Sequence, residues 1–306
     1  GTGVGMNALL SRSLGEKRQD VADQSANTGI FLYGCSAVAF ALIGLLFSRP
    51  FFHALTDNEQ IINYGSAYTM ICLGLSFGLY GQLCFERLLQ STGRTTLSMA
   101  SQISGAVINM ILDPILIFGW LGAPRLEVAG AAVATVIGQS CAAGIGLVLN
   151  LKYNPEVHLI PREVRWNTPI AKEIYRVGFP SILMMSIGSV MNFFLNRILI
   201  SFTEAATAVF GVYFKLQSFV FMPVFGMNSG LMPILGYNYG AKNRSRMMKA
   251  LKLGLVSAFI FMTLGAAVFF FFPDALLGLF NASDQMKVLG EVALRRICIT
   301  FPLAAI

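Results

Sequence analysis

A single carboxylate inside an apolar stretch is the residue of this sequence best placed to do chemistry. Asp113 lies in the run Ala106-Val-Ile-Asn109-Met-Ile-Leu-Asp113-Pro114, four residues after Asn109. In a helix, residues four apart lie on one face a single turn apart, so the amide and the carboxylate can share a ligand. Pro114 has no N–H to donate to the carbonyl of Met110, which leaves a further oxygen in the same place. The segment therefore predicts a site for Na+ or a proton, and the alternative is an Asp that is hydrogen-bonded for structure near a helix end.

Two hydroxyl side chains are candidates to complete this site. Thr135 lies in the next apolar run, which returns antiparallel to the Asp113 segment. Its spacing also allows the simpler role of a bond to its own i−4 carbonyl, that of Ala131. Tyr68 can either pack within its span or donate a hydrogen bond to a buried acid. If the ion is Na+, we expect Asp113, Asn109 and Thr135 to be its ligands.

Basic side chains within apolar runs occur in the second half of the chain. Lys215 and Gln217 lie deep in one run, and we assign both to a substrate cavity. Arg197 lies close enough to the end of its run for the long side chain to reach the membrane interface. The 14 Met and 25 Phe residues suit packing, and also a cavity for flat hydrophobic compounds.

The composition places all these residues in a membrane. Of the 306 residues 55% are hydrophobic and 12% are charged, against about 25% charged in soluble domains. Apolar residues extend along the whole chain, which excludes a soluble enzyme with one anchor. Windows of the length that spans a bilayer, about 20 residues, lie at 27–47, 61–84, 96–119, 128–151, 178–201, 207–236, 253–272 and from 288 onward. We therefore expect an all-α polytopic membrane protein.

The basic residues indicate how the spans are oriented. Most of the 22 Lys and Arg residues fall in alternate loops, whereas the other loops hold only Arg49, Arg125 and Lys287. Loops rich in Lys and Arg face the cytoplasm. The net charge of +7 is thus distributed by membrane side, and not clustered as a nucleic-acid partner would require. We expect a multi-pass protein of the inner (plasma) membrane whose partner is the lipid bilayer, with no nucleic acid.

One polar, proline-containing stretch divides the chain. We expect a first lobe at 1–153, a cytoplasmic linker at 154–177 and a second lobe at 178–306. Within the linker, Thr168 can cap a helix whose first residue is Pro169. Apolar residues then recur on one face, which predicts a short amphipathic helix on the cytoplasmic surface; the alternative is a solvated connector without a function.

An internal repeat relates the two lobes. A shift of 225 residues places Gly1, Gly5, Gly15, Gly29 and Gly65 on Gly226, Gly230, Gly240, Gly254 and Gly290. Chance predicts about one such match. Equivalent segments end on the same membrane side, so the repeat is parallel, as in transporters built from two similar halves. We expect two six-helix repeats, incomplete at both ends.

Motifs for enzyme catalysis are absent from the sequence. The two histidines, His53 and His158, fall in loops on opposite sides of the membrane, and no HExxH, GxSxG or P-loop pattern occurs. The five cysteines form no CxxC pair, so neither a disulfide nor a zinc framework is indicated. We predict a protein that is not an enzyme and has no cofactor.

Three segments resemble the multidrug and toxic compound extrusion (MATE) transporters, and most closely their bacterial multidrug branch. These segments are 105–119 with 128–135, Tyr237-Asn-Tyr-Gly240-Ala-Lys242 with its counterpart Ser13-Leu-Gly15-Glu-Lys17, and 215–223. The similarity covers the chain from the end of helix 2 to the start of helix 10 of a twelve-helix protein, and the Asn-xxx-Asp-Pro segment is its most specific part.

The resemblance implies two six-helix lobes that export organic cations in exchange for Na+ or H+. In relatives with an ion site in the first lobe, ligands come from helices 1, 4, 5 and 6. By motif, these roles carry over to Asn109, Asp113, Thr135 and Tyr68. Helix 1, whose acidic residue would complete the site, is outside this sequence.

We therefore predict a monomeric secondary antiporter for small cationic amphipathic substrates. The ion at Asp113 favours one arrangement of the lobes and the drug favours the other. A lipid-linked oligosaccharide flippase of the same superfamily is one alternative, because Lys215 and Arg197 would suit a pyrophosphate. A channel or membrane scaffold is another.

Overall fold

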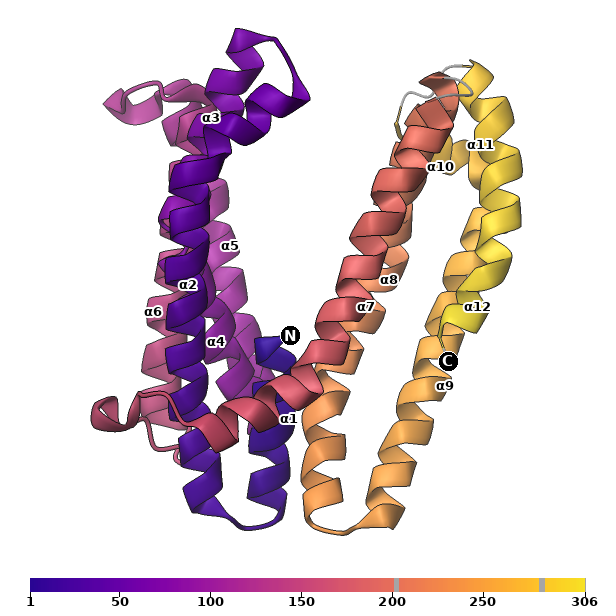
Figure 1. Ribbon diagram of the computed structural model, residues 1–306. Coiled ribbons are helices and arrows are strands. Elements are labelled where there is room, and N and C mark those ends of the chain that lie inside the picture. The colour runs from indigo at the N-terminus through magenta and orange to yellow at the C-terminus, as the bar shows by residue number, and fades with distance from the viewer. Residues whose placement is uncertain (201–203, 281–283, 306) are drawn as a thin grey trace. The chain divides into compact units, whose positions relative to one another are not determined.

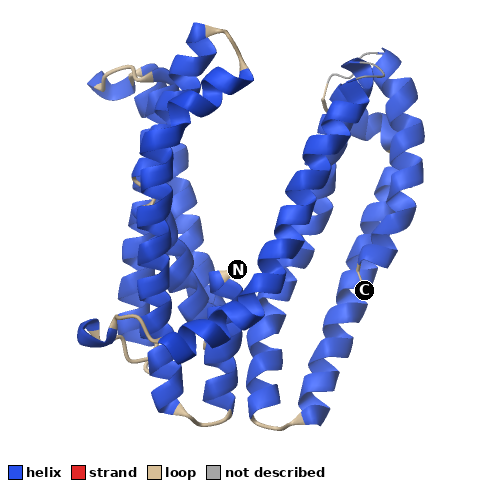
Figure 2. Ribbon diagram, viewed as in Figure 1, coloured by secondary structure: helices blue, strands red, loops and turns tan. Residues whose placement is uncertain are grey.

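The protein is built from helices that form two compact units. The computed structural model describes residues 1–200, 204–280 and 284–305, and within these residues every regular element is a helix (Figures 1 and 2). The units are Gly1–Phe179 and Pro180–Ile306. Six of the described helices are long and apolar enough to cross a membrane, and one bent pair makes a seventh. The prediction of an all-α polytopic membrane protein is confirmed.

The helices follow one another with short connections. The first unit contains α1 (Thr2–Gly15), α2 (Gln19–Leu55), α3 (Glu59–Gly74), α4 (Phe77–Ser91), α5 (Thr95–Phe118), α6 (Glu127–Tyr153) and the start of α7 (Thr168–Ile200). The second contains the rest of α7, α8 (Glu204–Gly240), α9 (Arg244–Phe271), α10 (Pro273–Gly278), α11 (Asp284–Ile297) and α12 (Phe301–Ala304). Three single turns of 3-10 helix complete the described elements: η1 (Trp120–Gly122), η2 (Pro161–Glu163) and η3 (Cys298–Thr300).

The span predicted at 61–84 is broken into two helices. Helices α3 and α4 are bent by 47° at the break between them. There the Ser76 hydroxyl donates a hydrogen bond to the carbonyl of Ala37 on α2, at 3.1 Å, which ties the bend to the neighbouring helix. Helix α4 then continues past the predicted end to Ser91, so Glu86 lies within a helix of the bundle.

The last predicted span, from Val288 onward, is also interrupted. Helix α11 gives way to η3 and then to α12. Helix α11 has only 14 residues, fewer than the about 20 that span a bilayer. Among the described residues this segment is not one of the helices able to cross a membrane.

The predicted linker helix is the beginning of α7. Asn167 provides its cap, because the Asn167 side chain accepts from the Ile170 N–H at 3.5 Å; the predicted cap, Thr168, instead accepts from the indole of Trp166 at 2.8 Å. Ile170 and Ile174 are buried against the first unit in a cluster with Leu32 of α2. The helix does not end at 177, as a short linker helix would, but continues through Pro180.

Two matching turns show the internal repeat in three dimensions. In the α1–α2 turn, Lys17 has a left-handed backbone with φ of 58°, and in the α8–α9 turn Lys242 has φ of 55°. The residue after each lysine donates its N–H back across the turn, from Arg18 to Ser13 and from Asn243 to Asn238, both at 2.9 Å. This is the Schellman helix ending. The two turns lie 225 residues apart, which is the offset of the glycine repeat.

Helices α5 and α6 approach each other closely at two glycines. A Cβ on Gly105 would lie 2.9 Å from the carbonyl oxygen of Gly138, and a Cβ on Gly138 would lie 2.8 Å from that of Gly105. The Ser101 hydroxyl reinforces the contact by donating to the carbonyl of Ala142 at 2.8 Å. Small residues let membrane helices pack closely where lipid provides no hydrophobic drive, and here they bring together the helices that carry Asn109 and Thr135.

The left-handed lysines lead to a first prediction. A residue with a Cβ in this conformation costs about 1 kcal/mol, and glycine avoids the cost. We expect Lys242→Gly to raise the thermal unfolding midpoint of the detergent-solubilised protein, whereas Arg244→Gly, within the first turn of α9, should lower it. A lower midpoint for Lys242→Gly would contradict the turn conformation.

The glycine contact leads to a second prediction. Gly138→Ala should destabilise the protein by about 1–3 kcal/mol, because the added methyl group meets backbone atoms that cannot move aside. Gly144→Ala on the same helix is the matched control, since a Cβ there has no neighbour within 4 Å. Thermal unfolding compares the two variants, and equal midpoints would show that α5 and α6 are not in close contact at Gly138.

Candidate functional site

The structure brings the predicted carboxylate, amide and hydroxyl together. The amide nitrogen of Asn109 lies 3.4 Å from the Asp113 Oδ1 on the same helix, and 3.4 Å from the Thr135 Oγ1 on α6. All three side chains are half-buried. The close packing of α5 on α6 at Gly105 and Gly138 makes this contact between helices possible.

Thr135 makes the bond within its own helix that its spacing allows, and it also faces Asn109. Its hydroxyl donates to the carbonyl of Ala131, four residues earlier, at 2.9 Å. A hydroxyl group also has two acceptor lone pairs, so the same oxygen can accept from Asn109. The bond to Ala131 therefore holds the Thr135 oxygen in place, facing Asn109.

Tyr68 reaches the same group of side chains from α3. Its hydroxyl interacts with the side chains of Thr135 and of Cys72, one turn further along α3, and it lies within the electrostatic reach of Asp113. Helix α3 packs on α6, which positions Tyr68 beside Thr135. We call Asp113, Asn109, Thr135 and Tyr68 the Asp113 cluster.

The chemistry of the Asp113 cluster suits a small hard cation or a proton. It offers a carboxylate, an amide and two hydroxyl groups, and oxygen donors are the ligands that hard cations prefer. Across the described residues, no group of three or more His, Cys, Asp and Glu side chains could hold a metal ion. The set thus fits a singly charged ion, balanced by one carboxylate, better than a transition metal.

A polar cavity adjoins the Asp113 cluster. It has a volume of about 430 Å³ and lies between α4, α5 and α6. The lining residues are Gln82, Gln102, Ile103, Gly105, Ala106, Asn109, Thr135, Gly138 and Gln139. Because Asn109 and Thr135 belong to both the cavity and the cluster, an occupant of the cavity can contact the side chains that surround Asp113.

Glu86 of α4 is a more deeply buried acid, which the sequence does not predict. The sequence predicts Asp113 as the single acid within an apolar run, and the predicted span 61–84 ends before Glu86; this is wrong, because α4 extends to Ser91 and Glu86 is only 6% exposed. The signal that could have found it is the spacing of Gln82, Glu86 and Gln90, four residues apart, which predicts one polar helix face.

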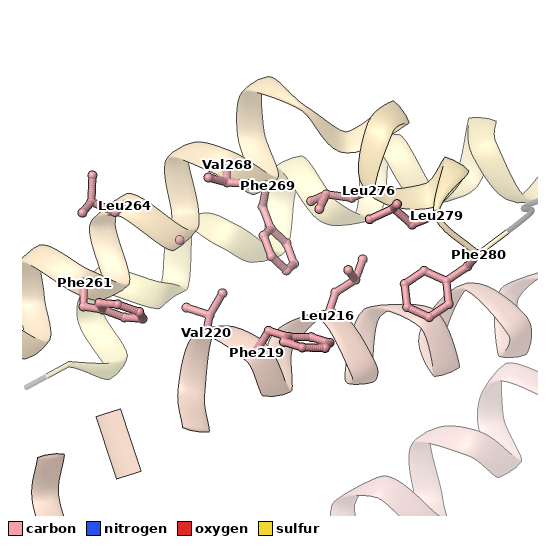
Figure 3. A pocket seen from close by; sticks show the side chains of 11 residues that line it. Leu216, Phe219, Val220, Phe261, Leu264, Val268, Phe269, Leu276, Leu279 and Phe280 are labelled. Atoms are coloured by element: carbon pink, nitrogen blue, oxygen red, sulfur yellow. The ribbon is translucent and has the colours of Figure 1, made fainter. Parts of the chain in front are cut away.

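The second unit contains a cavity of a different kind. Its volume is about 530 Å³, and all of its lining residues are apolar (Figure 3). Leu216 of α8 lines this cavity, whereas its neighbours Lys215 and Gln217 do not. The Lys215 ammonium lies 5.9 Å from the ring centroid of Phe280. A role for Lys215 and Gln217 in a substrate cavity stays a prediction.

Comparison with known proteins identifies the family. The MatE family model matches residues 1–115 and 180–306. The multidrug export protein MepA of Staphylococcus haemolyticus (strain JCSC1435) is 27% identical over 294 residues, which are 96% of this chain and 64% of that protein. MepA of Staphylococcus aureus (strain MSSA476) is 27% identical over 306 residues, with the same coverage. The chain therefore spans less than two thirds of the length of these relatives.

Solved structures agree on the fold. A MOP superfamily transporter from Pyrococcus furiosus superimposes with a TM-score of 0.91 at 24% identity, covering 99% of this chain and 68% of that one. An outward-facing multidrug resistance MATE family transporter gives a TM-score of 0.90 at 25% identity, covering 99% and 67%. With a family model that matches more than half of the chain, in both units, this multi-pass membrane protein belongs to the MATE transporter family.

Proposed function

We propose that this protein is a secondary antiporter that exports small organic cations in exchange for Na+ or H+ bound at the Asp113 cluster. The observation that carries the proposal is the placement of Asn109 between Asp113 and Thr135, across two helices of an apolar bundle. An ionised side chain in hydrocarbon costs several kcal/mol, so a carboxylate there needs polar neighbours or an ion. The MepA relatives are multidrug export proteins, which supports an organic cation as cargo.

The shared side chains explain why ion and substrate would exchange. Asn109 and Thr135 surround Asp113 and also line the adjacent cavity. An ion held at Asp113 orients the Asn109 amide and the Thr135 hydroxyl toward itself, and a cationic substrate in the cavity attracts the same oxygen atoms. Binding of one therefore weakens binding of the other, and this coupling is reciprocal.

The Asp113 cluster also links the ion to the conformation of the bundle. Its side chains come from α3, α5 and α6, so a bound ion draws three helices together. A ligand shifts a conformational equilibrium only by its difference in affinity for the two states. We infer that the ion favours the arrangement in which these helices are close, and that the organic cation favours the other arrangement. We place the protein in the inner (plasma) membrane as a monomer.

The test of the proposal is an exchange of Asp113 for its neutral isostere. In the full-length protein reconstituted into proteoliposomes, Asp113→Asn should lower the rate of ethidium efflux driven by an imposed Na+ or pH gradient at least about tenfold. A tenfold loss corresponds to about 1.4 kcal/mol of binding free energy. Asp57→Asn, in the exposed loop before α3, is the matched control and should keep the wild-type rate. Ion-driven efflux that persists in Asp113→Asn would refute the assignment.

Substitution of Thr135 separates the two candidate ions. A sodium ion needs several oxygen ligands, whereas a proton resides on the Asp113 carboxyl alone. If Na+ is the coupling ion, Thr135→Val should raise the Na+ concentration for half-maximal efflux by about tenfold, the effect of losing about 1.4 kcal/mol, and Thr135→Ser should restore it. If H+ is the ion, Thr135→Val should leave the dependence of efflux on the pH gradient unchanged and should alter only the ethidium concentration for half-maximal efflux. A Thr135→Val protein that loses both kinds of efflux would show that Thr135 acts in another way.

A further inference from the structure

Glu86 is a buried carboxylate that the proposed ion site does not use. Its Oε1 accepts a hydrogen bond from the Gln82 amide at 2.9 Å, and Gln102 of α5 is a second hydrogen-bonding partner. None of the ion pairs among the described residues includes Glu86. Burial of an unpaired carboxylate is unfavourable, and a purely structural role could be filled by a neutral side chain. We therefore expect Glu86 to have a function other than stabilising the fold.

The position of Glu86 connects one end of the bundle to the Asp113 cluster. Between Glu86 and the α4–α5 turn, the Gln90 amide donates to the Ser98 hydroxyl at 3.1 Å. That turn, at 92–94, is on the side that the basic residues assign to the cytoplasm. In the other direction, Gln102 and Asn109 are seven residues apart on one face of α5, about 10 Å along its axis.

The polar cavity occupies the gap between these two groups. Gln82 and Gln102, the partners of Glu86, line it together with Asn109 and Thr135. Its volume of about 430 Å³ is more than ten times the roughly 30 Å³ that one water molecule occupies in the liquid, and the amide groups of its lining can hydrogen-bond such water molecules. A proton can cross such a cavity along water molecules.

The surroundings of Glu86 are polar but hold few charges. An amide N–H of Gln82 donates to the carboxylate oxygen. The charged and titratable groups that act on Glu86 are few: Arg87 next to it on α4 and Tyr33 on α2. The cavity that separates it from Asn109 and Thr135 has no charged side chain in its lining.

We propose that Glu86 is a second proton-binding group, which relays protons between the Asp113 cluster and the cytoplasmic end of α4. A proton leaves the Asp113 carboxyl for water in the cavity, the Glu86 carboxylate accepts it from that water, and Glu86 then releases it to water at the α4–α5 turn. The reverse sequence reloads Asp113. This relay rests on the antiport function proposed above, with H+ as the coupling ion.

The test measures proton movement in the full-length protein. In proteoliposomes with a trapped pH-sensitive dye and ethidium as the probe substrate, Glu86→Gln should slow ethidium-driven proton movement about a hundredfold, the low end of what a positioned proton-transfer group contributes. Glu86→Asp, which keeps a carboxyl group, should retain most of the rate.

A matched control and three outcomes decide between the possibilities. Glu156→Gln makes the same exchange at an exposed residue of the loop after α6 and should move protons at the wild-type rate. A wild-type rate in Glu86→Gln would overturn the relay. So would a loss that Glu86→Asp does not restore, because Glu86 would then be structural. Exchange of ethidium for Na+ without proton movement would also overturn the relay, but it would not contradict the ion site at Asp113. That site is refuted only if Asp113→Asn retains ion-coupled efflux.

Discussion

The energetic cost of a carboxylate inside a membrane is the constraint on which this structure depends. Asp113 lies in an apolar helix, where an isolated charge costs several kcal/mol. The protein meets this cost with the Asn109 amide, two hydroxyl groups and an adjoining polar cavity. These polar groups come from separate helices, so the ionisation or ion occupancy of one side chain affects how the helices pack.

The backbone packing follows from the same requirement. Asn109 and Thr135 reach each other because α5 and α6 are in close contact at Gly105 and Gly138. Larger residues at these glycines would separate the helices and leave Asp113 with fewer partners. The small residues of this helix pair are therefore part of the site, although they contribute no donor or acceptor side chain to it.

Much of the fold and of the Asp113 cluster could be predicted from the sequence. Asp113 and Asn109 share a helix face through their spacing, and the glycine repeat anticipated the matching turns at Lys17 and Lys242. The sequence could not show the bend before α4, where Ser76 is bonded to another helix, because that contact joins residues far apart in the chain. The burial of Glu86 could not be predicted for a separate reason. A window of apolar residues ends at the first charged residue, whereas the helix itself continues to Ser91.

The most direct measurement of the central claim is infrared difference spectroscopy of the Asp113 carboxyl in the full-length protein. Ethidium binding should change the carboxyl absorption as the coupling ion leaves, either by loss of a protonated C=O band or by a shift of the carboxylate bands after Na+ release. The account predicts that this difference signal is present in the wild type and absent in Asp113→Asn. A difference spectrum that is the same in both proteins would contradict it.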